Sequence, residues 1–162
     1  METAIRATRR RPSFEELYAA HGPDARRVAY LLVGDRVQAE DVAQEAFVRV
    51  LGRFGDLRKP EAFRTYLMRT VVSLSKNHFR RRSLERRHAH AGRPPMPDAP
   101  ERDDDLFDAL KKLPERQRAA LVLRYCEDLS EHQTAEILNT STKAVKSLVT
   151  RGLAAMREEV AR

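Results

Sequence analysis

The chain of 162 residues carries 41% hydrophobic and 6% aromatic side chains and no tryptophan. This composition suffices for the compact cores of one or two small helical domains, and it excludes a broad β-sandwich or barrel. A formal net charge of +7 favours a polyanionic partner, although a basic surface that only keeps the protein in solution would carry the same charge.

Several classes of protein are excluded by features that the sequence lacks. It has no run of about 18 apolar residues, so we expect no membrane insertion. The basic N-terminal tail at residues 1–12 does not resemble a secretory signal, so a cytoplasmic location is expected. The single cysteine, Cys126, excludes an internal disulfide and a cysteine-cluster metal site. Because Cys126 lies in an apolar stretch, we expect a small buried side chain.

The first predicted domain covers residues 13–85 and is entirely helical. Ser13 and Glu16 have the spacing of a capping box at the start of a first helix. The glycine and proline at 22–23 are expected to break or kink that helix. Asp35 is the predicted N-cap of a second helix. Its apolar residues recur at helical spacing: Val42, Ala46, Phe47, Val50, Leu51 and Phe54.

A third helix is predicted after a short loop, with Pro60 in its first turn. We expect it to end among the arginines at 80–82. Its inward residues are Phe63, Leu67, Val71 and Leu74. Residues 86–104 then hold four of the chain's eight prolines and no hydrophobic periodicity. That composition is typical of a flexible linker between two domains.

The second predicted domain covers residues 105–162 and contains a helix-turn-helix. Ser130 and Gln133 form another capping box, and the short helix that follows is expected to end at Asn139 in a left-handed conformation. Ser141 caps the longer helix after it. That helix presents hydrogen-bonding and cationic side chains outward, as the DNA major groove requires: Thr142, Lys143, Lys146, Ser147 and Thr150. Two amphipathic helices with solvated polar faces would show the same pattern.

Positive charge gathers at the end of the third helix, in residues 76–82 with the sequence Lys-Asn-His-Phe-Arg-Arg-Arg. Arginine and lysine neutralise phosphates and planar groups stack on bases, so this segment suits single-stranded or melted DNA. A solvated basic helix end, which the helix dipole favours, is the alternative interpretation.

Carboxylates gather in residues 35–45, where Asp41 and Glu45 share one helix face. No histidine lies at ligand spacing near them, so the sequence predicts neither a metal site nor acid–base catalysis here. A surface that binds a basic partner is the better interpretation. A plain solvated acidic face explains the composition equally well.

In their order, these segments resemble the extracytoplasmic-function (ECF) sigma factors of bacterial RNA polymerase, most closely the subgroup common in actinobacteria. Residues 34–47 are similar to the polymerase-binding helix of that family, with its D-x-x-x-A-E-D-x-x-Q-E pattern. Residues 113–130 are similar to the opening of the family's second domain, and residues 145–147 to the core of its recognition helix. The resemblance covers about residues 14–159, with a proline-rich linker where the family has one.

The resemblance implies an all-α protein of two small helical domains, the second a helix-turn-helix, that directs core RNA polymerase to promoters without catalysis, cofactor or metal. Contacts with core polymerase are then expected at Asp41, Gln44, Glu45 and Phe47. Contacts with the melted −10 element are expected at Ser73, Lys76, Asn77, Arg80, Arg81 and Arg82. Contacts with the duplex −35 element are expected at Arg124, Thr142, Lys143, Lys146, Ser147 and Arg151. An anti-sigma factor is a further candidate partner, of which the sequence gives no direct sign.

The sequence departs from the family pattern at three positions. Ser73 stands where members usually have asparagine, which puts the inferred −10 base preference in question. Thr134 replaces a usual aliphatic residue, and Leu148 a usual polar or basic one, so −35 recognition is expected to be weaker or altered.

Two other functions are compatible with parts of the sequence. The first is a helix-turn-helix regulator that binds duplex DNA without polymerase, which would not need the acidic helix or the arginine-rich helix. The second is a helical hydrolase that uses Asp41 and Glu45, for which the sequence offers no metal-ligand spacing, phosphate loop or nucleophile–base pair.

Overall fold

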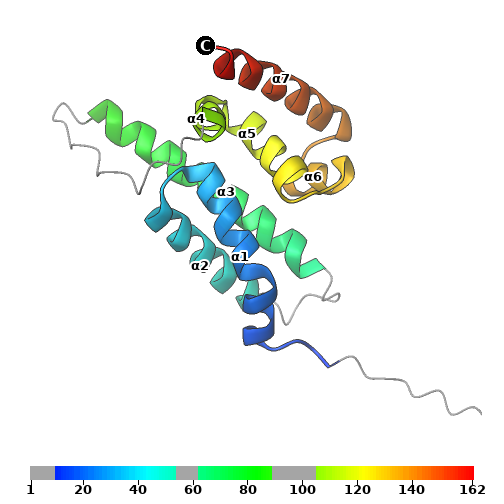
Figure 1. Cartoon of the computed structure of the whole chain (residues 1–162). Helices are drawn as coiled ribbons and strands as arrows, with labels where there is room; N and C mark the ends of the chain where they lie inside the picture. The colour runs from blue at the N-terminus through cyan, green and yellow to red at the C-terminus, as the bar shows by residue number, and fades with distance from the viewer. Residues whose placement is uncertain (1–9, 54–61, 89–104) are drawn as a thin grey trace, which may run out of the picture.

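The computed structural model describes residues 10–53, 62–88 and 105–162, and these contain helices but no strand. Two helical units follow one another along the chain (Figure 1). The first unit consists of α1 (Phe14–Val33), α2 (Arg36–Gly52) and α3 (Ala62–His88). The second consists of α4 (Asp105–Lys112), α5 (Glu115–Leu121), a π-helical segment η2 (Val122–Cys126), α6 (Glu131–Leu138) and α7 (Thr142–Val160). The predicted all-α fold with a helix-turn-helix is confirmed.

The predicted caps of α1 and α2 are present. The Glu16 N–H donates to Ser13 Oγ at 3.2 Å, and the Glu16 carboxylate accepts from the Ser13 N–H at 2.7 Å. At the start of α2, Asp35 Oδ1 accepts from the Gln38 N–H at 2.9 Å. Gly34 ends α1 with a φ of 77°, a left-handed conformation that permits an immediate turn into α2. Each cap satisfies an N–H that the helix itself leaves without a partner.

The expected break at Gly22 and Pro23 is wrong, because α1 runs through both residues to Val33. A proline inside a helix removes one backbone hydrogen bond and costs about 3 kcal/mol. Here the helix packs against α2 and α3, and it buries Gly22, Ala25 and Val28 on either side of the proline. Tertiary packing therefore outweighs the local penalty.

The core of the first unit lies where α3 packs against α1 and α2. Phe63, Leu67, Met68 and Val71 of α3 are each 0% exposed, as the predicted inward face of this helix requires. Phe54 and Pro60, which we placed in a second-helix stripe and a first turn, lie outside the described residues. The third helix does not end among the arginines at 80–82 but continues to His88.

The continuation of α3 has a local cause. Arg81 Nε lies 3.1 Å from the Glu85 carboxylate, an (i, i+4) pair that supports the helix where its described side chains are exposed. The three residues at 86–88, which we assigned to the linker, are therefore helical. The rest of the predicted linker, residues 89–104, lies outside the described part of the chain.

The second unit confirms the predicted helix-turn-helix in detail. The capping box of Ser130 and Gln133 is present, Asn139 ends α6 with a φ of 49°, and the Ser141 side chain accepts from the Ala144 N–H. Gly152 permits close packing of α7 on α5, because a Cβ there would lie 3.0 Å from a Leu121 methyl group.

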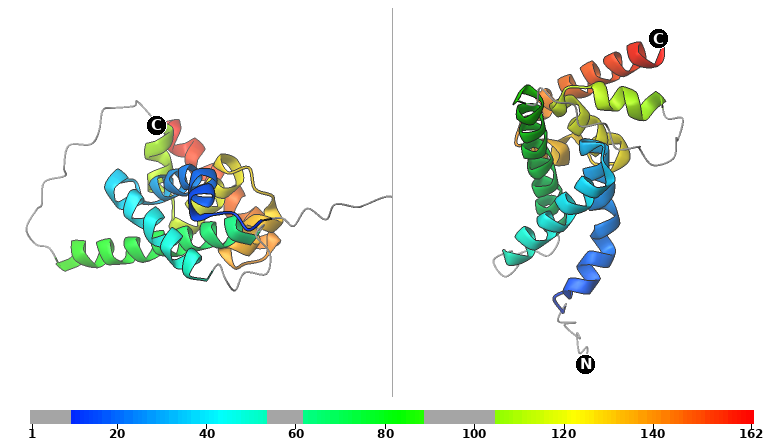
Figure 2. Two further views of the ribbon diagram at one scale, coloured as in Figure 1. Left: turned by 90° about the horizontal axis from the view of Figure 1, so that it is seen from below. Right: turned by 90° about the vertical axis from the view of Figure 1, so that its left-hand side faces the viewer.

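The two units pack against each other, chiefly α3 on α6 and α1 on α4 and η2 (Figure 2). Tyr30 of α1 stacks on Phe107 of α4 with ring centroids 5.0 Å apart. The buried Arg118 donates to the carbonyl of Leu32 at 2.8 Å, and its guanidinium lies 4.8 Å from the ring centroid of Phe79. The described chain is therefore closed, with apolar and polar contacts between its halves.

Candidate functional site

One face of α2 carries the acidic residues that we predicted to bind core polymerase. Asp41, Gln44 and Glu45 are exposed. Val37 and Val48 stand on the same face at helical spacing, and they are 73% and 70% exposed. We call these five residues the α2 face. Exposed valines beside carboxylates give a surface that combines apolar area with negative charge, which complements a basic protein surface.

Phe47 does not belong to the α2 face, which corrects its predicted contact with polymerase. Its side chain is 2% exposed. The ring lies 5.1 Å from the Tyr18 centroid and 5.9 Å from that of Phe63, inside the core of the first unit. Phe47 can affect polymerase binding only by holding α2 in place against α1 and α3.

The second half of α3 carries the residues predicted to contact the −10 element. Ser73, Asn77, Arg80, Arg81 and Arg82 are exposed, and Lys76 is half-buried. The C-terminal end of the helix projects away from the helices that pack on its first half (Figure 2). These side chains therefore line one accessible stretch of helix, which ends in three consecutive cations.

His78 and Phe79, which lie between Asn77 and Arg80, are half-buried. Nε2 of His78 is buried and has no hydrogen-bond partner among the described residues. Burial lowers the pKa of His78, and the nearby Arg82 and Arg81 lower it further. The Phe79 ring already packs against Arg118 and is therefore not free to stack on a base. The side chains that this half of the helix offers to DNA are cationic and polar.

The first turns of α7 carry most residues predicted to contact the −35 element. Thr142, Lys143, Lys146, Ser147 and Arg151 are all exposed. Val145 and Leu148 anchor the opposite face, at 0% and 9% exposed. Leu148 therefore belongs to the domain core, so its departure from the family pattern does not place an apolar side chain on the DNA-facing surface.

Arg124 has a different position from the other predicted −35 residues. It lies in η2, is half-buried, and donates from Nη1 to the carbonyl of Leu129, just before α6. Asp128, next to that carbonyl, has a φ of 51°. Arg124 thus stabilises the turn that precedes the helix-turn-helix through one guanidinium nitrogen. The remainder of its side chain is partly accessible.

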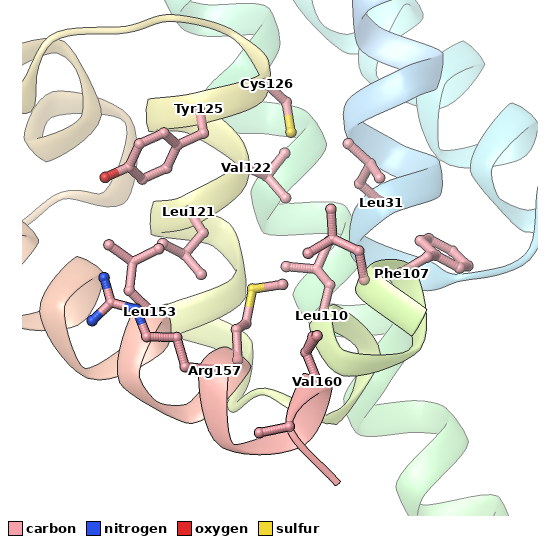
Figure 3. A pocket seen from close by; sticks show the side chains of 13 residues that line it. Leu31, Phe107, Leu110, Leu121, Val122, Tyr125, Cys126, Leu153, Arg157 and Val160 are labelled. Carbon is pink, nitrogen blue, oxygen red and sulfur yellow. The ribbon is translucent and has the colours of Figure 1, made fainter. Parts of the chain in front are cut away.

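Sequence reasoning missed an apolar groove of about 640 Å³ between the two units (Figure 3). Leu31 of α1 faces Phe107 and Leu110 of α4 across it. The groove is further lined by Leu106, Leu121, Val122, Tyr125, Cys126, Leu153, Met156, Arg157, Val160 and Ala161. Only the amphipathic pattern of α7 hinted at it, since Leu153 and Met156 were expected inside and are half-buried.

Cys126 is exposed at this groove, so its expected burial is wrong. Partial desolvation and the neighbouring Glu127 raise the pKa of the thiol, whereas Arg27 lowers it. The thiol is consequently protonated at neutral pH and is a weak nucleophile.

The ion pairs between the two units were also not predicted. Glu127, at the end of η2, has a side chain that is 0% exposed, and its carboxylate contacts Arg27 of α1 and Arg64 of α3. The hydrogen bond to Glu127 raises the pKa of Arg27. These partners lie 100 and 63 residues from Glu127 in the sequence, so no local pattern could have indicated them.

Comparison with known proteins agrees with this arrangement of surfaces. The model of sigma-70 region 2 matches residues 17–85, and the model of sigma-70 region 4 matches residues 103–156. The RNA polymerase sigma-E factor of Streptomyces coelicolor is 36% identical over 151 residues, which cover 91% of this chain and 85% of that protein. The ECF RNA polymerase sigma factor SigE of Mycolicibacterium smegmatis is 33% identical, over 93% of this chain and 63% of that protein.

Solved structures share the fold. The sigma factor RpoE of Bartonella quintana, in complex with the anti-sigma factor NepR, superposes with a TM-score of 0.75 at 19% identity, over 91% of this chain and 96% of that one. CnrH, in complex with the cytosolic domain of CnrY, superposes with a TM-score of 0.68 at 23% identity, over 90% of this chain and 85% of that one.

Fold and surfaces thus define a two-domain subunit that directs RNA polymerase to promoters. The chain belongs to the ECF sigma factors of the sigma-70 family. Because the chain belongs to this family, the two alternative functions that the sequence left open, a DNA-binding regulator that acts without polymerase and a helical hydrolase, are excluded. None of the described helices is long and apolar enough to cross a membrane.

Proposed function

We propose that three separate surfaces of this sigma factor divide its work in the cytoplasm: the α2 face binds core RNA polymerase, the second half of α3 binds the melted −10 element, and the start of α7 reads the −35 element. The observation that supports this division is shared by all three helices. Each exposes most of its polar and charged residues on one face, while most of its apolar residues are buried in the unit to which it belongs.

The α2 face suits a basic protein surface. Gln44 Nε2 donates to Glu40 at 3.1 Å and Arg49 pairs with Glu45 at 2.5 Å, which holds these side chains against the helix. Asp41 has no partner of this kind among the described contacts and is free to meet an incoming cation. Exposed ion pairs contribute at most about 1 kcal/mol to the fold, so these carboxylates are available for binding at little cost.

The α3 surface suits single-stranded DNA. Its arginines lie along a projecting helix and can contact successive phosphates, while Asn77 and Ser73 offer hydrogen bonds to base edges. Because Ser73 is exposed and shorter than the asparagine usual in the family, we infer a weaker or different base preference at that position.

The α7 surface suits the major groove of duplex DNA. Thr142, Lys143, Lys146 and Ser147 stand on the first turns of the helix, where recognition helices contact bases and phosphates. Lys146 lies 3.6 Å from Glu131, an exposed pair that DNA phosphates would replace readily. The part of Arg124 that remains accessible is placed for a backbone phosphate.

Charge reversal on the α2 face tests the polymerase assignment. We expect the double substitution Asp41→Lys with Glu45→Lys to weaken binding to core polymerase at least tenfold, because two attractions become repulsions. The fold should remain intact, since both residues are exposed. The measurement is the dissociation constant from labelled sigma factor and purified core enzyme, with circular dichroism as the check on folding.

Reversal of a carboxylate elsewhere is the matched control. Glu15→Lys with Glu158→Lys changes the net charge equally, far from the α2 face, and should leave the affinity within twofold. Equal binding of core enzyme by the α2 variant and the wild type would contradict the assignment.

We further propose that the apolar groove binds a helix of an anti-sigma factor. The groove has an almost wholly apolar lining with Arg157 at its edge, which fits an amphipathic helix that carries an acidic residue. Two proteins with the same fold have been solved with anti-sigma factors bound. Substitution Leu153→Asp should abolish capture of the cognate anti-sigma factor, whereas unchanged capture would refute this site.

A further inference from the structure

Glu127 is a buried acid whose two cations come from the other unit. It ends η2 in the second unit, and its side chain is 0% exposed. Arg27 of α1 approaches one carboxylate oxygen at 2.6 Å, and Arg64 of α3 approaches the other at 3.1 Å. Both arginines belong to the first unit, so the neutralisation of Glu127 depends on how the two units are placed.

Further hydrogen bonds cross the same boundary. Arg64 also lies 3.5 Å from the carbonyl of Glu127, and Arg69 of α3 donates to the carbonyl of Glu136 at 2.8 Å. A buried carboxylate that loses its cations is strongly disfavoured, so it must either regain them or become hydrated. Separation of the units would expose Glu127 to water, whereas their contact requires both arginines. The closed arrangement and this ion cluster therefore depend on each other.

The closed arrangement cannot place both DNA surfaces on one promoter. The −10 and −35 elements lie about 25 base pairs apart, which is about 85 Å along B-form DNA. In the closed chain α3 touches α6 through the bond from Arg69 to Glu136. At 1.5 Å per residue, the −10 residues of α3 extend only about 20 Å beyond Arg69. The start of α7 directly follows α6, so the two surfaces lie well short of the required span.

We propose that Glu127, Arg27 and Arg64 form a latch that holds the free sigma factor closed and that must open before both promoter elements can be bound. Binding of core polymerase would draw the two units apart and hydrate the three charges. The closed state would then reduce the apparent affinity for polymerase, because only the open fraction can bind with both units. This consequence, unlike the latch itself, rests on the proposed polymerase contact.

Distance measurements on the free, full-length chain test the latch. Spin labels at Arg36→Cys and Asp108→Cys, in a Cys126→Ser background, lie on either side of the contact between Tyr30 and Phe107 and report the distance between the start of α2 and α4 by double electron–electron resonance. We expect one short distance for the parent protein. We expect Glu127→Gln to shift it to longer and broader values, and Arg27→Gln with Arg64→Gln to do the same from the other unit.

Two further variants make this test specific. Arg26→Gln removes a cation from the same helix, but Arg26 pairs with Glu40 inside the first unit, so the short distance should persist. Combination of Glu127→Gln with both arginine substitutions should open the chain no further than either set alone, because all three act through one cluster. Unchanged distances in the Glu127 variant and in the double arginine variant would overturn the proposal.

Binding to core polymerase tests the consequence. Both latch variants should bind at least threefold tighter than the parent protein, and Arg26→Gln should not. Equal affinities for an opened variant and the parent would overturn the role of the latch in binding. Failure of the parent itself to bind core enzyme would instead contradict the proposed function, while the distances of the free chain would still report on the latch.

Discussion

At the scale of single residues, burial decides which departures from the family pattern matter. Thr134 is 0% exposed, and its hydroxyl has no hydrogen-bond partner among the described residues. It lies inside the helix-turn-helix, at one of the three positions where the sequence departs from the expected family pattern. The residue therefore affects the stability of that motif and does not contact DNA.

We predict that Thr134→Val stabilises the protein by about 1 to 3 kcal/mol, because valine keeps the shape and removes an unsatisfied buried hydroxyl. The free energy of unfolding, measured with urea, checks this. Thr134→Ser keeps the hydroxyl and loses a methyl group, so it should destabilise. A valine variant less stable than the parent would show that the hydroxyl has a partner.

His78 makes stability depend on pH. Burial, then Arg82 and Arg81, hold its pKa below the ordinary 6.5. The folded chain therefore binds this proton more weakly than the unfolded chain does. The contribution to stability is fully present above the unfolded pKa, and it is lost as the pH falls through the folded value.

The midpoint temperature of thermal unfolding should consequently decrease as the pH is lowered from about 7 to about 5.5. The substitution His78→Gln should make this decrease smaller. The midpoint temperature of the His78 variant should still depend on pH, because burial and Arg64 also lower the pKa of His21. The acids with lowered pKa values, Glu16, Asp108 and Glu159, titrate below this range. An identical pH profile for parent and His78 variant would rule out this role.

At the scale of helices, local chemistry was predicted well and long-range contacts were not. The caps at Ser13, Asp35, Ser130 and Ser141 depend on residues three apart, so the sequence alone reveals them. The continuation of α1 through Pro23 depends on packing against α2 and α3. The spacing of residues within α1 does not indicate this packing.

The candidate site divides in the same way. Exposed polar residues on α2, α3 and α7 followed from helical periodicity and family motifs. Phe47 was misplaced because a family motif does not distinguish a residue that contacts the partner from one that holds the helix in position. The apolar periodicity of the second helix already favoured its burial, and the structure adds Tyr18 and Phe63 as the side chains beside it.

The start of α7 yields a quantitative prediction about DNA. Lys143 and Lys146 are exposed cations on a helix placed for the −35 duplex. If both contact phosphates, Lys143→Ala with Lys146→Ala should reduce the slope of log affinity against log salt by about 2. Fluorescence anisotropy with −35 duplexes over a salt series measures this. An unchanged slope would show that these lysines do not meet the DNA backbone.

At the scale of the whole molecule, the structure adds what the sequence could not show, namely the placement of the two units. The sequence indicated two helical domains and the order of their surfaces. The ion cluster at Glu127 forms only where α1 and α3 meet the second unit, and Leu31 of α1 completes the lining of the groove (Figures 1 and 3). Regulation of this sigma factor is therefore expected to act at that boundary.

Polymerase-dependent initiation at promoters is the central property proposed for this sigma factor. The most direct measurement combines the purified full-length chain with core RNA polymerase on genomic fragments and maps the 5′ ends of the transcripts. We predict defined start sites preceded by shared −10 and −35 sequences, absent without the chain and lost with the Asp41→Lys, Glu45→Lys variant. Start sites that do not depend on the chain, or that lack shared upstream elements, would contradict it.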